Sequence, residues 1–314
     1  MAYHSNTLVY LVYTDINMDT LRILVVSQKG GVGKSTLSAN LSVWFSEKAY
    51  KSTVLLDLDP HGSSSTWVRE ARSSDVVTEH CVLDDFDARR WLINCRNRVR
   101  RHVSKVEVLI CDLTWTAAMD PEILYEFDLV IVPTSVSSIE LSATTRFIET
   151  IGWVFNSKNG ISPTLLLCPS RVSEAELTTD PFSARDFSVP FMLLPPIYND
   201  DSVRQLFKKQ FVFDVNESLA GQSYGRCAQS IQQAGIIHKQ AARAIKVKFS
   251  DRRFLDTHNT KLSRYMAEKS GPRLSGNDVA IGKPAEYSKG NTADKGRKNL
   301  SGLSKILESV IGPK

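Results

Sequence analysis

A glycine-rich stretch near the start of the chain, VVSQKGGVGKSTLSANL at residues 25–41, has the composition of a phosphate-binding loop. Its glycines allow backbone N–H groups to converge on an anion, and a helix that begins directly after them would add the positive end of its dipole. The residues that we expect to bind the nucleotide are consecutive in the chain: Lys29, Gly30, Gly31, Val32, Gly33, Lys34, Ser35 and Thr36. Lys34 is expected to reach the β- and γ-phosphates, and Ser35 is expected to bind Mg²⁺.

This loop carries a second lysine, Lys29, five residues before Lys34. The common phosphate-binding pattern opens with glycine, whereas Gln28 stands at that position here. The spacing raises the question of why one nucleotide site would carry two lysines.

Three aspartates close apolar runs that we interpret as buried strands. Asp57 and Asp59 close STVLLDLD, and Asp112 closes VEVLICD. An acidic residue at the end of such a strand holds Mg²⁺ in phosphate-loop proteins, often through water. Asp57 or Asp59 alone could instead cap a helix or a turn. As a set beside the loop, they predict a metal site made by Ser35, Asp57 and Asp112.

These side chains must be positioned by the strands and helices around them. Apolar, β-branched runs occur at residues 21–27, 52–59, 106–112, 128–134, 163–170 and 189–197. Helical patterns lie between most of them, for example at residues 35–49 and 138–155. Strands that are apolar on both faces and alternate with helices predict an α/β fold, with a doubly wound, mostly parallel sheet and helices on both faces. Ligands bind such sheets at the carboxyl ends of the strands, where the polar residues named above lie.

The patterns divide the chain into four parts. Residues 1–20 are expected to be a leader, either disordered or upstream of a true translation start at Met18. Residues 21–250 are expected to form the α/β domain. Residues 251–298 are poor in large apolar side chains, which predicts a disordered basic linker. Residues 299–314 have apolar side chains at spacings of three and four, which predicts a short amphipathic helix.

The charge of the chain is divided unevenly. Residues 1–238 contain 22 Lys and Arg and 27 Asp and Glu, whereas residues 239–314 contain 17 and 7. A basic end favours an anionic partner, either nucleic acid or membrane, although a solvated extension has the same composition. No apolar run reaches the roughly 18 residues that a membrane span needs. The five cysteines lack CxxC spacing, which argues against a disulfide framework or a zinc site.

Two segments together, SQKGGVGKST and VLLDLDPHGSSSTW, closely resemble the ParA/MinD group of deviant-Walker ATPases, and the ParA branch in particular. The resemblance covers about residues 21–230, including the weaker motifs IVPTSVSSIELSATTRFIETI and IYNDDSVRQLFKKQFVFD. It implies ATP and Mg²⁺ as ligands. It also implies that Lys29 crosses a dimer interface to the partner's phosphates, that Lys34 and Asp59 act in catalysis with Asp59 orienting the attacking water, and that Asp57 lies near the metal.

The resemblance further implies a function. Proteins of this branch form a homodimer in the ATP state, bind non-specific DNA and position plasmids, chromosomes or protein cargo. Hydrolysis is slow, is stimulated by an adaptor protein and resets the switch. The expected location is the cytoplasm, in association with the nucleoid.

Two positions depart from the family pattern. His61 stands where glutamine is usual. Leu113-Thr114-Trp115 follows Asp112, where the family has Thr-Pro-Pro or glycine. Because this segment is expected to sense the γ-phosphate, the departure leaves the rate of hydrolysis open.

DNA binding of this type uses phosphate contacts and needs only Lys and Arg on one face. We expect these contacts from the basic residues Arg204, Lys208, Lys209, Arg243 and Lys246. The first two are spaced to share one face of a helix. A third stretch, residues 88–105, has the pattern of an amphipathic helix, whose basic side is more readily explained as a solvated face.

The alternative function is a MinD-like switch that acts at a membrane or on a partner complex. MinD relatives end in an amphipathic helix that inserts into the membrane surface, and residues 299–314 have a suitable apolar face. The segment is short and has few cations, so a membrane is the less favoured partner. Docking on another protein and packing against the ATPase domain remain open.

Overall fold

The computed structural model describes the backbone of residues 19–82, 88–156, 162–178, 181–183 and 187–269. By its internal contacts the chain divides into a unit of residues 1–256 and a unit of residues 257–314. The first unit contains the whole sheet described here. Of the second unit the structure describes only residues 257–269, which are helical.

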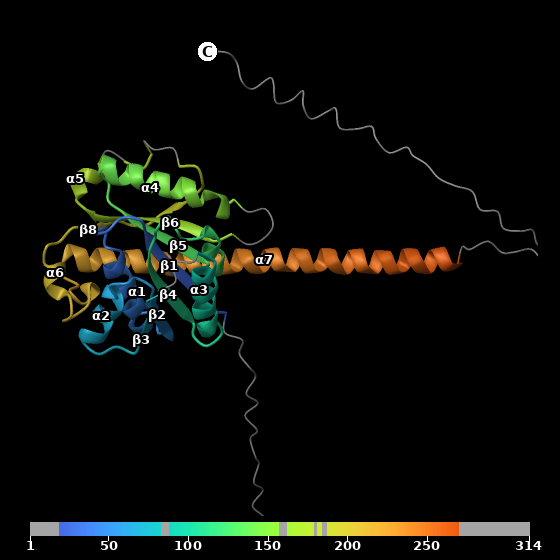
Figure 1. The fold of residues 1–314 in the computed structure, drawn as a ribbon, viewed down its shortest axis with the longest axis horizontal. Coiled ribbons are helices and arrows are strands. Elements are labelled where there is room, and N and C mark those ends of the chain that lie inside the picture. Colours follow the sequence, from blue (N-terminus) through green and yellow to red (C-terminus); the bar gives the residue numbers. More distant parts are fainter. Residues whose placement is uncertain (1–18, 83–87, 157–161, 179–180, 184–186, 270–314) are drawn as a thin grey trace, which may run out of the picture. The chain divides into compact units, whose positions relative to one another are not determined.

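The first unit is built on a sheet in which the described strands pair in parallel (Figure 1). The strands are β1 (Leu21–Ser27), β2 (Thr53–Asp57), β3 (Val77–His80), β4 (Val108–Thr114), β5 (Leu129–Thr134), β6 (Thr164–Val172), β7 (Met192–Leu193) and β8 (Ile197–Tyr198). Their order is β3-β2-β4-β1-β5-β6-β7, and β8 also pairs with β6. Because the chain winds outward on both sides of β1, the sheet is doubly wound, as the sequence predicts.

Helices cover both faces of this sheet (Figure 1). One face is covered by α1 (Lys34–Glu47), α2 (Ser63–Glu70) and the first part of α7 (Leu219–Lys269), and the other by α3 (Ala88–His102) and α4 (Ser138–Ile151). Shorter turns are α5 (Glu174–Leu177), α6 (Val203–Leu206), and the 3₁₀ turns η1 (Pro121–Glu126), η2 (Gly152–Val154) and η3 (Val212–Asp214). Alternate residues of β1 enter two separate cores, with Ile23 and Val25 on one face and Leu24 and Val26 on the other.

Two details of the sheet differ from the sequence prediction. The apolar run at residues 189–197 forms two short strands, β7 and β8, instead of one. Pro195 and Pro196 lie between them, and proline has no N–H to donate to a strand ladder. The sequence does not predict β3, because its residues VTEH lack an apolar run and lie half exposed at the edge of the sheet.

The last helix runs past residue 250, the expected end of the domain. α7 continues to Lys269, so residues 251–269 are helical and do not belong to a disordered linker. Extending an existing helix adds one backbone hydrogen bond for each residue and avoids the cost of a new nucleus, so scarce apolar residues do not prevent it. Residues 270–298 of the expected linker and the expected helix at residues 299–314 lie outside the described residues.

The expected leader lies largely outside the described residues as well, which begin at Asp19. Its last two residues nevertheless belong to the domain. Thr20 is buried and its hydroxyl donates to the carbonyl oxygen of Val106 at 2.7 Å. Asp19 accepts a hydrogen bond of 2.8 Å from Nζ of Lys239. The domain therefore begins before Leu21.

A buried ionic cluster ties the amino-terminal edge of the sheet to α7. Asp128, directly before β5, accepts hydrogen bonds from Arg22 and lies 3.0 Å from Nζ of Lys239. Nε2 of His238 lies 3.7 Å from the same carboxylate, and its Nδ1 lies 2.9 Å from Oγ1 of Thr164. The cluster therefore joins β1, β5, β6 and α7 at the edge opposite the glycine-rich loop.

Candidate nucleotide site

The glycine-rich loop connects β1 to α1 at the carboxyl end of the central strand. Gly31 and Gly33 have φ of +80° and +86°, in the left-handed region that glycine adopts without strain. A Cβ at Gly33 would also lie 2.8 Å from Oγ of Ser170, so the packing of the loop against β6 requires glycine there. α1 begins at Lys34 without a side-chain cap or an acidic residue in its first turn, which leaves its first N–H groups available to an anion.

A cavity of about 740 Å³ opens beside this loop. Its size falls within the range of about 300–1,000 Å³ that is usual for small-molecule sites. Every residue of the predicted loop lines it except Val32, which is buried in the protein. Most of the remaining lining comes from the segments at the ends of β2, β4 and β8, and Trp91, Arg171 and Tyr224 complete it. The cavity therefore lies at the carboxyl ends of the strands, as the sequence predicts.

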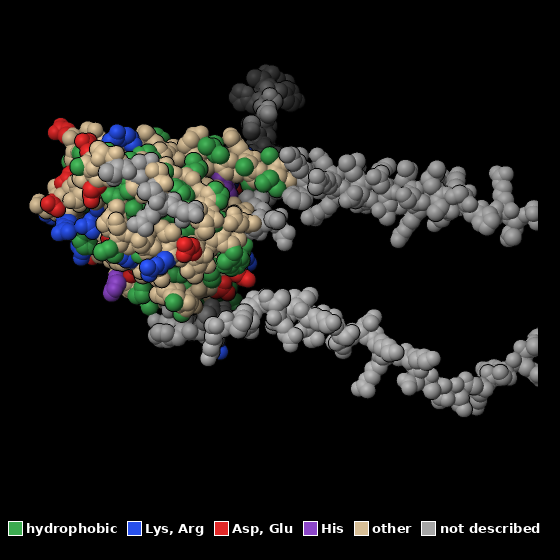
Figure 2. Space-filling view, turned by 90° about the horizontal axis from the view of Figure 1, so that it is seen from above, with side chains coloured by type: hydrophobic (Ala, Val, Ile, Leu, Met, Phe, Trp, Pro, Cys, Tyr) green, Lys and Arg blue, Asp and Glu red, His purple; other side chains and the backbone are tan. Residues whose placement is uncertain are grey.

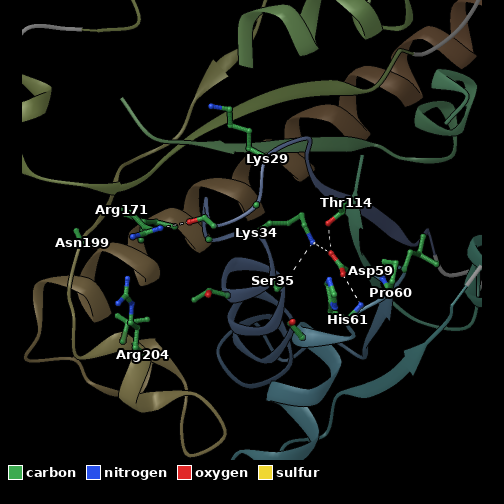
Figure 3. Close-up of a pocket in the computed structure, with 18 of the residues that line it drawn as sticks. Lys29, Lys34, Ser35, Asp59, Pro60, His61, Thr114, Arg171, Asn199 and Arg204 are labelled. Atoms are coloured by element: carbon green, nitrogen blue, oxygen red, sulfur yellow. Dashed lines mark hydrogen bonds and ion pairs between the residues drawn. The ribbon is translucent and has the colours of Figure 1, made fainter. Parts of the chain in front are cut away.

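Three charged side chains meet at the base of the cavity. Nζ of Lys34 lies 2.7 Å from Oδ1 of Asp112 and 3.0 Å from Oδ2 of Asp59, the contact drawn in Figure 3. The three side chains are at most 10% exposed. They meet because β2 and β4 are neighbouring parallel strands, with Asp57 directly opposite Asp112 in the register.

The ionisation of these groups follows from their contacts. Burial by itself lowers the pKa of Lys34, but Asp112 and Asp59 outweigh it and raise the pKa, so the lysine is charged. Burial by itself raises the pKa of Asp59. The hydroxyl of Thr114, the N–H of His61 and Lys34 outweigh burial and lower this pKa to about 2. Burial raises the pKa of Asp112 and outweighs the attraction of Lys34. Lys34 and Asp59 therefore form an ion pair, and an incoming phosphate must compete with Asp59 for Lys34.

Asp57 lies opposite Asp112, and both of its carboxylate oxygens accept hydrogen bonds from the backbone. Its Oδ1 accepts a hydrogen bond of 3.1 Å from the N–H of Asp59, and its Oδ2 accepts one of 2.8 Å from the N–H of Ser65. Both oxygens thus hold the segment that leads from β2 into α2. This arrangement favours the capping role that the sequence leaves open for Asp57.

Asp112 is better suited to a cation. Oδ2 of Asp112 and Oγ of Ser64 are buried close to each other, and neither makes a hydrogen bond of good geometry among the described residues. A buried carboxylate oxygen without a donor is costly unless a cation or water compensates it. Ser35, which lines the same cavity, can provide a hydroxyl ligand. The residues present therefore fit Mg²⁺ held by Ser35 and Asp112.

Lys29 has a different direction from Lys34. In Figure 3 its side chain points away from Lys34 and from the ionic cluster. It lines a second, small pocket together with Glu140, a residue of the first turn of α4. The pKa of Glu140 is lowered, first by a hydrogen bond with Ser135 and further by the positive charges of Lys29 and Arg171. Lys34 is thus held in the ionic cluster, whereas Lys29 borders both this small pocket and the nucleotide cavity.

The structure adds Arg171, which sequence reasoning missed, and a contact of Thr114, which the sequence names only as part of the segment after Asp112. Nη1 of Arg171, in β6, donates a hydrogen bond to the carbonyl oxygen of Gly31, so its guanidinium lies over the loop (Figure 3). The hydroxyl of Thr114, at the end of β4, donates to Oδ2 of Asp59. The sequence did contain a signal for both residues. Each is a polar or charged side chain near the end of an apolar run, and such ends lie at the ligand-binding edge of a parallel sheet.

The helical face predicted from Arg204 and Lys208 does not exist. α6 is a single turn that ends at Leu206, and Lys208 has a φ of +64°, outside any helix. Phe207 packs edge-on against Trp67 with ring centroids 5.2 Å apart, and this contact takes the chain out of the helix. Arg204 lines the nucleotide cavity instead, and Nζ of Lys208 lies 2.9 Å from Oε2 of Glu70.

The other predicted DNA contacts, Lys209, Arg243 and Lys246, differ in exposure and in their neighbours. Lys209 is exposed. Arg243, on α7, is also exposed and lies 3.1 Å from Oδ2 of Asp19, whereas the side chain of Lys246 lies outside the described part of the structure. On the face of the protein shown in Figure 2, Lys and Arg side chains lie among Asp and Glu side chains.

The basic helix predicted at residues 88–105 forms as α3. Its predicted apolar residues Trp91, Leu92, Cys95 and Val99 are buried. At least four of its arginines are paired: Arg98 lies 2.5 Å from Glu79 and Arg100 lies 2.5 Å from Glu126, and Arg96 and Arg101 contact the same two glutamates. This helix therefore resembles the solvated, ion-paired face that the sequence also allowed. Over the residues that the structure describes, no helix has the length and apolar character to cross a membrane.

A doubly wound parallel sheet with a glycine-rich loop, a helix and strand-end aspartates at its carboxyl edge defines a P-loop NTPase fold. The family model of the CobQ/CobB/MinD/ParA nucleotide binding domain matches residues 23–306. The chain therefore belongs to this family of nucleotide-binding domains.

Individual relatives are more distant. Over 130 residues the chain is 26% identical to maintenance of carboxysome distribution protein A of Halothiobacillus neapolitanus. That match covers 41% of this chain and 57% of the relative, so the chain spans little more than half the length of the curated protein it matches.

Solved structures share the fold at low identity. An ATP complex of McdA from Cyanothece has a TM-score of 0.52 and 12% identity, with 69% of this chain and 96% of that chain covered. A plasmid partition protein of Borrelia burgdorferi bound to AMPPNP has a TM-score of 0.51 and 15% identity, covering 68% and 99%. The MinC:MinD complex of Aquifex aeolicus has a TM-score of 0.51 and 13% identity, covering 68% and 96%.

Proposed function

We propose that the chain is a ParA-type ATPase whose ATP-bound form is a homodimer with two nucleotides between the chains. The observation that best supports this proposal is the direction of Lys29. This lysine belongs to the phosphate-binding loop but points away from the cluster of Lys34, Asp59 and Asp112 (Figure 3). A lysine in that position would neutralise phosphate charge on a nucleotide held by the second chain.

Within one chain the roles divide among a few residues. The loop N–H groups and Lys34 bind the phosphates, and Ser35 and Asp112 hold the cation. Mg²⁺, when bound, neutralises charge that develops on the phosphates. Asp59 orients the attacking water, and Asp57 holds the backbone of Asp59 in place through the hydrogen bond at 3.1 Å.

The same geometry supports a switch. Lys34 contacts two carboxylates, and bound phosphates would draw it away from at least one of them. The ends of β2 and β4 would then respond to the nucleotide, and these segments lie beside the loop that carries Lys29. After hydrolysis Lys34 would return to the carboxylates and the dimer would separate. An adaptor protein would increase the rate of hydrolysis.

The cargo-positioning part of the proposal rests on the similar proteins. One relative is named for maintaining carboxysome distribution, and one structural neighbour is a plasmid partition protein. We propose that this chain likewise positions a plasmid, chromosome or protein cargo on non-specific DNA. Lys209 and Arg243 are the exposed described candidates for phosphate contacts. A MinD-like action at a membrane or on a partner complex through residues 299–314 is the second candidate, favoured only by their amphipathic sequence.

The dimer is tested by sizing chromatography with ATP, with ADP and without nucleotide. We expect a dimer only with ATP, and Lys29→Ala should remain a monomer while still binding ATP. Lys105→Ala is the matched control, since it removes an exposed lysine at the other end of the strands. Asp59→Ala should bind ATP, dimerise and barely hydrolyse it. A monomeric Asp59→Ala variant would count against the sandwich arrangement.

DNA binding is tested by fluorescence anisotropy with random-sequence duplex DNA at two salt concentrations. We expect binding that requires ATP and weakens steeply with salt, because phosphate contacts release counterions. If the ATP dimer forms but binds no DNA, the membrane or partner alternative becomes the better explanation. Co-sedimentation with anionic vesicles, with and without residues 298–314, then separates those two.

A further inference from the structure

The segment after Asp112 departs from the family pattern, and the structure shows how it is arranged. β4 continues to Thr114, and its residues alternate between the two faces of the sheet. Leu113 is 1% exposed and belongs to the core beneath α3 and α4. Asp112 and Thr114 lie on the opposite face and border the nucleotide site. Thr114 is thus the one residue of Leu113-Thr114-Trp115 that lines the cavity.

The position of Thr114 is tightly held. It is paired with Ser27, the last residue of β1, and the N–H of Trp115 donates to the carbonyl oxygen of Ser27 at 2.9 Å. Trp115 is buried and packs against Phe147 with ring centroids 5.6 Å apart. The threonine hydroxyl is therefore carried by a strand end that is fixed on both sides.

This hydroxyl donates to the oxygen of Asp59 that also receives Lys34. Oδ2 of Asp59 accepts from Oγ1 of Thr114 and from Nζ of Lys34, the latter at 3.0 Å. The other oxygen, Oδ1, accepts from the N–H of His61 at 3.0 Å. When Lys34 turns toward phosphate, Oδ2 loses one donor and gains a free acceptor position on the side of the phosphates.

We propose that Thr114 is a positioning residue for Asp59: its hydroxyl keeps the carboxylate at the cavity after Lys34 has left it, so that the freed position on Oδ2 can orient the attacking water. The proposal rests on the proposed ATPase function. It assigns to Thr114 an orienting role in a segment where this chain has neither the Thr-Pro-Pro nor the glycine of its relatives. Thr114 touches Asp59 and acts through it.

The kinetic test compares Thr114→Val with Thr114→Ser. Valine has the shape of threonine without the hydroxyl, and the side chain is only partly buried, so the variant should fold. We expect kcat for ATP hydrolysis to fall by about 10- to 100-fold, as for other small losses of alignment, while KM for ATP stays nearly unchanged. Serine retains the hydroxyl and should restore most of kcat. The ATP-bound dimer of Thr114→Val should also persist longer on a sizing column.

A second measurement needs no nucleotide. Thermal unfolding of the nucleotide-free protein is followed for the wild type, Thr114→Val, Asp59→Ala and the double variant. If the hydroxyl acts on Asp59, Thr114→Val lowers the unfolding midpoint in the wild type but not in the Asp59→Ala background. An equal decrease in both backgrounds would overturn the proposal, because Thr114 would then act on the fold alone.

The outcomes separate this proposal from the function on which it rests. A wild-type chain that does not hydrolyse ATP would contradict the ATPase function, and with it the positioning role. A wild-type chain that hydrolyses ATP, together with a Thr114→Val variant of the same kcat, would contradict only the positioning role. A rise in KM without a fall in kcat would also contradict it, since it would place Thr114 in binding.

Discussion

Two buried ionic clusters lie at opposite edges of the same sheet, and they differ in what surrounds them. At the carboxyl edge, Lys34 bridges Asp59 and Asp112 beside a cavity of about 740 Å³. At the amino edge, Arg22 and Lys239 both bind Asp128, which is packed between strands and α7. The first cluster lies beside the phosphate-binding loop. In the second cluster the shared carboxylate of Asp128 is buried, although Lys239 also reaches a separate cavity of about 750 Å³.

The two clusters also differ in how completely their polar atoms are paired. Asp112 has one buried oxygen without a partner in the described structure. Both oxygens of Asp128 are hydrogen-bonded, with donors from the backbone and the side chain of Arg22. A carboxylate oxygen without a partner beside the phosphate-binding loop can take a new ligand, whereas both oxygens of the buried Asp128 already accept hydrogen bonds. The comparison therefore separates charges that respond to a ligand from charges that hold the fold.

The largest expected effect is the loss of ATP binding in Lys34→Ala. ATP affinity should fall by about 100-fold or more, because charge-assisted hydrogen bonds contribute about 1.5–3 kcal/mol each. ATP-dependent dimerisation should be lost as well. Titration with a fluorescent ATP analogue measures the affinity, and circular dichroism should show a folded protein. If the variant binds ATP normally, the cluster of Lys34, Asp59 and Asp112 does not respond to the nucleotide, and the contrast with the cluster around Asp128 fails.

The next effect concerns the amino edge. Asp128→Ala leaves Arg22, Lys239 and His238 without their common partner, and removal of one member of a buried pair costs about 3–5 kcal/mol. Denaturant unfolding should show this loss, while the variant binds ATP normally under conditions in which it remains folded. Asp75→Ala, which removes an exposed carboxylate, is the control and should change stability little. A weakened ATP affinity in folded Asp128→Ala would show that the two edges are coupled.

A smaller effect should follow pH. Burial lowers the pKa of His238 from its ordinary 6.5 and outweighs the attraction of Asp128, with Lys239 and Arg22 acting in the same direction as burial. The folded protein therefore binds this proton less readily than the unfolded chain, and stability is highest above the unfolded pKa. It decreases as the pH falls through 6.5 toward the lowered pKa. The pKa of Asp128 is also lowered, but from 3.8, so its contribution is lost only in stronger acid.

The measurement is the free energy of unfolding between about pH 7.5 and 5.5. His238→Gln should flatten part of this dependence, because glutamine has no proton to gain. His61→Gln, at an exposed histidine, should leave the dependence as it is. An equal slope in the wild type and in His238→Gln would contradict the assignment.

The smallest expected effect is at an exposed pair on the amino edge. Nζ of Lys51 lies 2.8 Å from Oε1 of Glu107, with side chains that are 42% and 35% exposed. Lys51→Ala should change the free energy of unfolding by no more than about 1 kcal/mol, since exposed pairs are screened by water and salt. A loss as large as that of Asp128→Ala would show that burial is not what distinguishes these contacts.

Much of the fold was predictable because its signals are local. The apolar runs of β1, β2, β4, β5 and β6 are continuous, and the glycine-rich loop marks a strand end and a helix start. The fold class and the family are confirmed. The roles assigned to the site residues remain predictions, although the structure does bring Lys34, Asp59 and Asp112 into contact.

The failures have a common physical origin. The edge strand β3 is stabilised by its neighbour β2 and not by an apolar sequence of its own. The short α6 ends where Phe207 packs on Trp67, a contact between residues far apart in the chain. The extension of α7 past residue 250 depends on a helix that is already formed. In each case the element depends on a neighbour that lies outside its own stretch of sequence, so its own residues do not predict it.

The sequence alone determined the phosphate-binding loop, the strand-end aspartates and the layers that carry them, because residue type and spacing govern turns, strands and helix starts. Only the tertiary structure decided which partners each of these side chains contacts. In the folded chain Asp57 accepts hydrogen bonds from backbone N–H groups, and one oxygen of Asp112 has no partner among the described residues. The side chain of Lys29 points away from Lys34, and Thr114 donates a hydrogen bond to Asp59. These outcomes depend on which strands become neighbours and in which register, and that is settled by packing over the whole sheet.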